Sequence, residues 1–214
     1  MTKHKSIKSI SNSKAMKKRI SLIAALLLVL ASCQKKQEPI EITSEEYHAS
    51  FTKLGEGKPI MYTGRPIYQH VKAGDLPSEI GLFEEILPAK SLGAPPHTHT
   101  NEDEIFIVLE GEVHFLNGTD EVIAGPGTVA SLPRNNQHGF WNPYDEPAQL
   151  LVLVAPGHFQ EFFGAVEKAV TEAKASTPQE IGAIIGQEAA KRGVMIDMSA
   201  LPPSALALLP PPPQ

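Results

Sequence analysis

The chain has 214 residues, a length that suits one ordinary domain with appendages. Its formal net charge is −5. The charge is uneven, because residues 1–32 hold seven Lys/Arg and no Asp/Glu, which leaves a net charge near −12 on the remainder. Such an acidic remainder repels the phosphates of nucleic acids and anionic lipids, so we exclude nucleic acid as a partner.

The first 32 residues have the organisation of an export signal. Lys17-Lys18-Arg19 precedes an apolar run of 11 residues, Ile20–Leu30, which is shorter than the ~20 residues of a membrane-spanning helix. The segment Leu30-Ala31-Ser32-Cys33 resembles a bacterial lipobox. That resemblance implies that residues 1–32 are a lipoprotein signal peptide and that Cys33 is lipidated. Ordinary signal cleavage beside an incidental Cys33 is the alternative.

We therefore expect an exported protein of the cell envelope, lipid-anchored to a membrane and facing the periplasm or the exterior. Residues 33–46 are polar and charged, and we interpret them as a tether. Cys33 is the only cysteine, so no disulfide within the chain and no second thiolate is available. The sequence leaves open whether Met1 or Met16 is the true start.

Residues 47–157 have the pattern of an all-β domain with an N-terminal extension. Residues 47–75 are poor in apolar side chains, and we expect irregular structure and short strands there. Beyond them, apolar runs recur roughly every 8–12 residues between turn signals, which indicates an antiparallel sandwich or barrel. The turn signals include Gly93-Ala94-Pro95-Pro96 and Asn117-Gly118. Strands are expected near residues 79–87, 105–110, 113–116, 121–124, 128–132, 137–142 and 148–154.

Residues 158–193 change to a helical period. Phe159, Phe162, Phe163, Val166 and Val170 share one face of a helix over about 158–174, and we interpret them as core rather than as a binding stripe. A second helix should begin at Thr177-Pro178-Gln179-Glu180, which has a capping box, and end at Gly193. We expect residues 194–214 to be a Pro-rich tail, extended or disordered from Leu201 onward.

Four residues of the β region have the chemistry of a metal site. His97 and His99 are two residues apart, so on a strand both imidazoles face the same side. Glu104 opens the next strand and His138 belongs to a distant one. Three imidazoles and a carboxylate suit a divalent ion, which could be Fe, Mn, Ni, Co, Cu or Zn.

Strand parity also predicts the surroundings of this site. Phe106 shares a face with Glu104, and Phe140 shares a face with His138, so both rings should line a substrate pocket beside the metal. Trp141 has the opposite parity and should pack outside the cavity. A partly apolar pocket of this kind suits a small organic ligand with an oxygen to offer the metal.

These residues resemble the two motifs of the cupin family. The first motif is matched by Gly93, His97, His99, Glu104 and Gly111, and the second by Gly127, Pro133, Asn135, His138 and Asn142. Two departures occur. Gly93 lies closer to His97 than in the family pattern, and Asn135 stands in place of a glycine, a position whose left-handed backbone Asn tolerates. The resemblance implies an all-β double-stranded β-helix, a jelly-roll barrel, followed here by two α-helices.

The exit from the last strand, Ala155–Phe163, resembles single-domain cupins of the quercetin-2,3-dioxygenase type. That likeness implies that His97, His99 and His138 hold the metal, while Glu104 is both a ligand and the catalytic base that takes a proton from a substrate hydroxyl before O₂ adds. We favour a dioxygenase acting on a hydroxylated aromatic or enediol. A cupin isomerase or lyase, or a non-catalytic module that binds a small molecule or metal, is the alternative. The expected partners are a small-molecule ligand and, through the lipid anchor, a membrane; a homodimer stays open.

Overall fold

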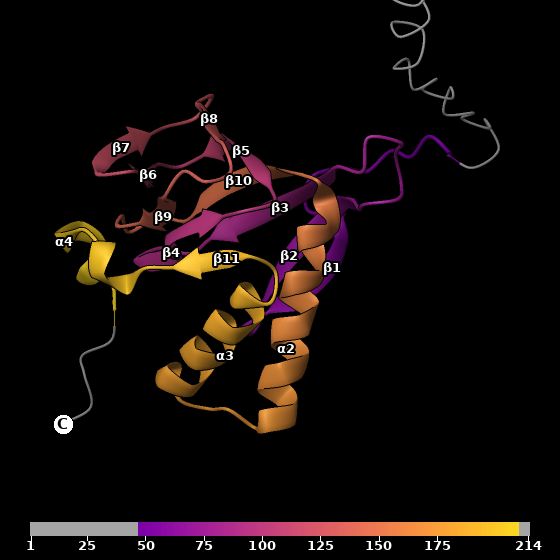
Figure 1. Ribbon diagram of the computed structural model, residues 1–214. Coiled ribbons are helices and arrows are strands. Elements are labelled where there is room, and N and C mark those ends of the chain that lie inside the picture. The colour runs from indigo at the N-terminus through magenta and orange to yellow at the C-terminus, as the bar shows by residue number, and fades with distance from the viewer. Residues whose placement is uncertain (1–46, 210–214) are drawn as a thin grey trace, which may run out of the picture. The chain divides into compact units, whose positions relative to one another are not determined.

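The computed structural model describes residues 47–209, which form two antiparallel sheets followed by helices (Figure 1). The first sheet has the strand order β1-β2-β3-β10-β5-β8, and the second has the order β11-β4-β9-β6-β7. The strands are β1 Lys58–Tyr62, β2 Arg65–Val71, β3 Gly81–Leu87, β4 Ser91–His99, β5 Asp103–Glu110, β6 Val113–Asn117, β7 Asp120–Ala124, β8 Val129–Leu132, β9 His138–Asn142, β10 Ala148–Ala155 and β11 Val194–Ile196. The expected all-β jelly roll with C-terminal helices is confirmed.

Buried and partly exposed side chains alternate along the strands, and the buried ones form the interior of the barrel. In β10 the side chains of Ala148, Leu150, Val152 and Val154 are buried, and the residues between them are partly exposed. The same period of two in β5 turns Glu104, Phe106 and Val108 inward. One face of the first sheet thus contributes both apolar core and the one acidic residue expected at a metal.

The stretch Gly93–Pro96 does not break the chain, contrary to our expectation. It lies inside β4, whose pairing with β9 shifts register twice, between Leu92 and Ala94 and again between Ala94 and His97. Bulges of this kind accommodate prolines, which cannot donate a ladder hydrogen bond. The shifts bring His97 opposite His138 across the two strands.

The N-terminal extension adds a hairpin to the first sheet. Strands β1 and β2 pair antiparallel, and β2 continues onto β3 with Ile67 opposite Glu85. This agrees with the short strands expected within residues 47–75, although the sequence did not indicate that they would join the barrel. The consequence is that Arg65 is carried into the first sheet.

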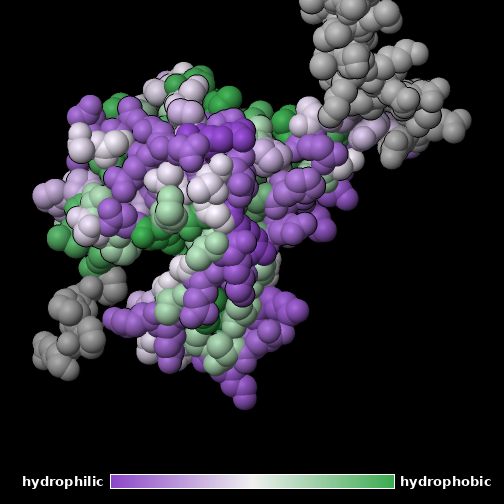
Figure 2. Space-filling view, in the orientation of Figure 1, coloured by the Kyte–Doolittle hydropathy of each residue, from purple (hydrophilic) through white to green (hydrophobic). Residues whose placement is uncertain are grey.

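Two helices follow the barrel and lie side by side in Figure 1. They are α2, Glu161–Ala173, preceded by a 3-10 turn at Gly157–Gln160, and α3, Pro178–Ala190. The capping box is present: Thr177 Oγ1 accepts from the Glu180 amide at 3.2 Å, and Glu180 Oε2 accepts from the Thr177 amide at 3.0 Å. In Figure 2 hydrophilic residues dominate the outer surface of the helices, and hydrophobic residues gather where they meet the barrel.

Residues 194–209 form regular elements, whereas we expected a Pro-rich tail that is extended or disordered from Leu201 onward. Val194–Ile196 forms β11, which pairs with β4 so that Val194 is opposite His99 and Ile196 is opposite His97. A short 3-10 turn at Met198–Ala200 and helix α4, Pro203–Leu206, follow. This segment covers the open edge of β4 and then packs through Ala205 against Leu116 and Trp141 on the outer face of the sheet.

That outer face confirms the expected position of Trp141. The indole is 1% exposed and packs with Leu116 and with Ala205 of α4, away from the barrel interior.

Within residues 47–209 none of the helices has the length and apolar character needed to cross a membrane. The predicted signal peptide, tether and lipidated Cys33 lie outside the described residues, as do residues 210–214.

Candidate metal centre

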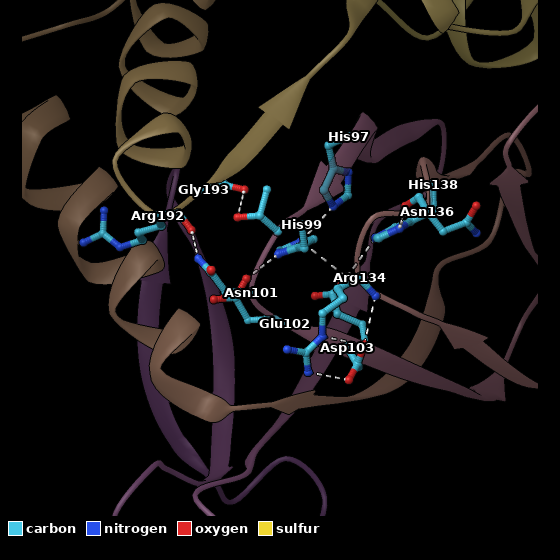
Figure 3. A network of polar contacts seen from close by, with 12 residues as sticks. His97, His99, Asn101, Glu102, Asp103, Arg134, Asn136, His138, Arg192 and Gly193 are labelled. Carbon is cyan, nitrogen blue, oxygen red and sulfur yellow. Dashed lines mark hydrogen bonds and ion pairs between the residues drawn. The ribbon is translucent and has the colours of Figure 1, made fainter.

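The structure brings together the four residues that the sequence predicts as ligands. His97 and His99 end β4, Glu104 lies at the start of β5, and His138 begins β9. One donor atom from each lies within 4.8 Å of those of the others, and all four side chains are buried. Figure 3 shows the three imidazoles turned toward one another.

A second layer of contacts orients each imidazole. The Nδ1–H groups of His97 and His138 donate to backbone carbonyls two residues earlier, Pro95 at 2.8 Å and Asn136 at 3.0 Å. The Nδ1–H of His99 donates to the Glu102 carboxylate at 3.0 Å. Because carbonyl and carboxylate oxygens only accept, each Nδ1 carries the proton and each neutral Nε2 keeps a free lone pair.

Those lone pairs face one another across short distances. The Nε2 atoms of His97 and His99 are 3.1 Å apart, His138 Nε2 lies 3.0 Å from Glu104 Oε2, and His99 Nε2 lies 3.6 Å from that oxygen. Acceptors this close repel unless a cation lies between them. Donors sharing one metal at about 2.1 Å should be roughly 3.0–3.4 Å apart, so the cluster fits a divalent ion.

The electrostatics keep the ligands in their metal-binding forms. Burial, reinforced by the neighbouring His138 and His99, lowers the pKa of His97 to about 3, so this imidazole is neutral at physiological pH. Burial raises the pKa of Glu104, but the polar environment of His138, His99 and His97 outweighs burial, and the net pKa is lowered. Neutral imidazole and ionised carboxylate are the forms that coordinate metals.

The loop between β4 and β5 is tied to the end of α3. Thr100 Oγ1 donates to the carbonyl of Gly193 at 2.9 Å, and Asn101 Nδ2 donates to that of Arg192 at 2.9 Å (Figure 3). Gly193 has a φ of 76°, and a Cβ there would lie 2.3 Å from Thr100 Oγ1. This close contact positions the loop that carries Glu102, whose carboxylate accepts a hydrogen bond from His99.

On the other side, the turn before β9 is held against β4. Asn135 has the left-handed φ of 63° expected where the family pattern has a glycine, and its amide donates to the carbonyl of His99 at 2.7 Å. The guanidinium of Arg134 makes a two-point ion pair with Asp103, the residue before Glu104. These contacts connect the two segments that supply all four ligands.

The cluster forms part of the wall of a cavity of about 90 Å³. One water needs about 10–15 Å³ on this scale, so the space suits a small molecule. Phe106 and Phe140 line it, as strand parity predicts. The ring of Phe140 lies over the Cα of Gly93, where a Cβ would meet the ring at 2.1 Å, which explains why a glycine stands at this motif position.

The aromatic residues of the helical region are both core and cavity wall. Phe159 and Phe162 belong to the main apolar cluster, and both also line the cavity together with Phe163. The Phe159 ring packs edge-on against the imidazole of His99, with 4.7 Å between the ring centroids. Our interpretation of these residues as core was therefore incomplete.

A second polar group lies in the same wall, and the sequence did not reveal it. Arg65 of β2 and Glu85 of β3 form an ion pair with 2.8 Å between Nη2 and Oε1, and Tyr62 of β1 lies beside them. Burial, together with the charge of Glu85, raises the pKa of Tyr62 to about 12. Burial raises the pKa of Glu85, although Arg65 opposes that shift.

Two of the missed residues, Glu85 and Glu102, could have been detected from the sequence. Glu84 and Glu85 interrupt an otherwise apolar strand, so one of them had to face the interior. Glu102 lies three residues after a predicted ligand, within reach of its free ring nitrogen. Arg65 and Tyr62 could not, because their relation to the site depends on how β1 and β2 pair.

Comparison with known proteins agrees with this architecture. Residues 83–154, about a third of the chain, match the family model described as the cupin domain. No curated protein matches the chain.

Solved structures similar to this chain include three enzymes. A sugar phosphate isomerase of the cupin superfamily from Silicibacter pomeroyi is 29% identical, with 42% of this chain and 58% of that one covered and a TM-score of 0.39. The polyketide cyclase RemF from Streptomyces resistomycificus is 22% identical over 51% and 80%, with a TM-score of 0.44. The DMSP lyase DddQ from Ruegeria pomeroyi is 28% identical over 42% and 45%, with a TM-score of 0.36. The chain spans less than two thirds of the first of these, and none of these likenesses indicates an activity for it.

Proposed function

We propose that this protein is a metal-dependent enzyme of the dioxygenase type that acts on a small hydroxylated aromatic or enediol. One observation carries the metal dependence: four acceptor atoms converge in a buried cavity, while the protons of the three imidazoles are directed elsewhere. Such a set has a use only when it holds a cation. The reaction type rests on the likeness of Ala155–Phe163 to cupins of the quercetin-2,3-dioxygenase type. The cupin fold by itself does not fix the reaction.

The residues have distinct roles in this proposal. His97, His99 and His138 hold the ion through Nε2, and Glu104 supplies a carboxylate oxygen to it. A divalent ion held there would act as a Lewis acid that acidifies a bound hydroxyl group. Phe106 and Phe140 exclude water and position the ring or enediol of the ligand.

Glu104 is the proposed base. The residue is 6% exposed, and it lines the cavity beside His138. A base must approach the hydroxyl proton to within about 2.6–3.2 Å, and Glu104 is the acidic residue nearest to any oxygen bound at the cluster. After the proton has moved to Glu104, the electron-rich oxygen of the ligand is held against a dry, apolar wall.

The test combines elemental analysis with oxygen uptake. Protein purified from its native envelope should contain one divalent metal per chain and consume O₂ with at least one member of a panel of catechols, flavonols and enediols. Tight binding without turnover would instead favour a non-catalytic binding module. Conversion of the ligand without O₂ uptake would favour an isomerase or lyase.

We also propose that the domain works at the cell envelope, tethered through a lipid on Cys33. The lipobox-like Leu30-Ala31-Ser32-Cys33 and the polar residues 34–46 support this. Cells fed a labelled fatty acid should label the wild type, and Cys33→Ala should abolish the label. A wild type that takes up no label would contradict the proposal.

A further inference from the structure

We infer that the ligand of this cavity carries, besides the oxygens that meet the metal cluster, a neutral hydroxyl group that is bound between Arg65 and Glu85. The inference rests on the proposed function and narrows its substrate class. It concerns the part of the wall built by β2 and β3, which neither the sequence motifs nor the metal cluster uses.

The two polar groups lie at different ends of the cavity. Across the first sheet Glu85 is opposite Leu150 of β10, whereas Glu104 is opposite Val154. Those positions on β10 are four residues apart, or roughly 13 Å along the strand. Between them the cavity wall is apolar, with Phe83, Phe106 and Val152.

The Arg65–Glu85 pair has unused hydrogen-bonding capacity. Among residues 47–209, Arg65 Nη1 is a buried nitrogen without a hydrogen-bond partner. Glu85 Oε1 lies 2.8 Å from Arg65 Nη2 but makes no hydrogen bond of acceptable geometry, and it too is buried. Leaving a buried charged group unsatisfied is costly, so the pair is suited to a bound polar group.

The chemistry of the pair selects what that group is. Nη1 can only donate and Oε1 of the carboxylate can only accept, so the matching ligand atom must accept one hydrogen bond and donate another. A hydroxyl group does both. A carboxylate or phosphate would satisfy Arg65 but repel Glu85, and an apolar substituent would satisfy neither.

Tyr62 adds a third polar group that suits a hydroxyl at this end. Its phenol lines the cavity and interacts with both Glu85 and Arg65. The phenol is protonated at physiological pH, and burial raises its pKa further, to about 12, so it can donate to or accept from a hydroxyl. The ligand class is then a small catechol or enediol with one further hydroxyl on a substituent directed away from the metal.

Three catechols that differ in one substituent test this. They are 4-methylcatechol, 3,4-dihydroxybenzyl alcohol and 3,4-dihydroxybenzoate, which place a methyl, a hydroxymethyl and a carboxylate at the same position. Their binding to the full-length protein in detergent, loaded with Zn²⁺ so that oxidation does not interfere, can be measured by calorimetry. The alcohol should bind at least about tenfold more tightly than the methyl compound, and the carboxylate should gain no such advantage.

Variants locate the effect. Arg65→Met combined with Glu85→Met removes both charges, which preserves folding better than removing one, and should abolish the preference for the alcohol. Arg192→Met is the matched control: Arg192 also pairs with a glutamate, Glu188, its side chain is 23% exposed like that of Arg65, and it does not line the cavity. It should leave the preference unchanged.

Equal binding of the alcohol and the methyl compound to the wild type would overturn the inference while leaving the proposed function intact. Tightest binding of the carboxylate would overturn it in favour of an anion site. A preference that persists in the Arg65→Met/Glu85→Met variant would overturn it as well. If none of the three catechols binds, the inference is overturned, whereas the proposed function is decided separately by the oxygen-uptake panel of catechols, flavonols and enediols.

Discussion

The two polar ends of the cavity are built on opposite principles. At the metal cluster, three imidazoles direct their protons away from the cavity and their lone pairs into it, so that end presents acceptors only. At the other end, Arg65 and Glu85 present a donor and an acceptor side by side. A set of acceptors requires a cation, whereas a balanced pair is suited to a neutral hydroxyl.

The difference shows two ways in which the free-energy cost of burying polar groups is offset within one small cavity. Buried charges are tolerated when they are paired or bound to a metal. The acceptors of the candidate metal cluster would be compensated by a bound cation, whereas Arg65 and Glu85 largely compensate each other's charge. The following experiments break one end at a time, from the largest expected effect to the smallest.

Removing the imidazoles should have the largest effect, because it takes away three of the four ligands. We expect the triple variant His97→Ala/His99→Ala/His138→Ala to lose stoichiometric metal, measured by mass spectrometry of purified protein. Arg65→Met/Glu85→Met, which alters only the other end, should keep it. Full metal content in the triple-histidine variant would show that the cluster is not the metal site.

Glu104→Gln should keep some metal through the three histidines but lose its ability to accept a proton. Removal of a general base costs about 10²–10⁴-fold in rate. We expect a loss in that range for oxygen-dependent turnover, measured by single-turnover kinetics and compared per bound metal. Equal rates per metal would leave Glu104 as a ligand alone.

Breaking the ion pair should cost more than removing it. Arg65→Met leaves Glu85 buried without its partner, and we expect the free energy of unfolding to fall by about 3 kcal/mol. Arg65→Met/Glu85→Met should be more stable than this single variant. Urea denaturation compares them, and a double variant less stable than the single one would contradict the argument.

Glu102 should influence the metal through His99. We expect Glu102→Ala to weaken metal affinity by about 10–100-fold, because the His99 ring loses the acceptor that fixes its Nδ1 proton. Glu102→Gln is the control, since its amide oxygen can still accept that proton. Competition with a coloured chelator measures both, and equal affinities for the Glu102→Ala variant and the wild-type protein would exclude the role.

The last effect is a gradual one, and it is the smallest when taken per pH unit. The pKa of His97 is about 3 in the folded protein and 6.5 as its ordinary value, so between these values the unfolded chain binds the extra proton. The free energy of unfolding of chelator-treated protein should therefore fall as pH decreases from 6.5 toward 3, by up to about 1.4 kcal/mol per pH unit. His97→Gln should show a shallower decline in urea denaturation, and parallel curves would contradict the assignment.

Much of the candidate site was encoded in local patterns of the sequence. The spacing of His97 and His99 on a strand, and the parity that puts Phe106 with Glu104 and Phe140 with His138, are properties of a two-residue period. The capping box at Thr177 and the left-handed turn at Asn135 are equally local, because each depends on a few neighbouring backbone groups. Such local features do not depend on how distant parts of the chain pair.

Tertiary structure alone decided the rest. Arg65 meets Glu85 only because β2 joins β3 with Ile67 opposite Glu85, and that register is a long-range choice with no local signal. Likewise Val194–Ile196 becomes a strand because β4 has a free edge beside its histidines. The sequence by itself therefore determined the four candidate metal ligands and the class of fold. The choice of ligand at the far end of the cavity depends on strand pairings that bring together residues distant along the chain.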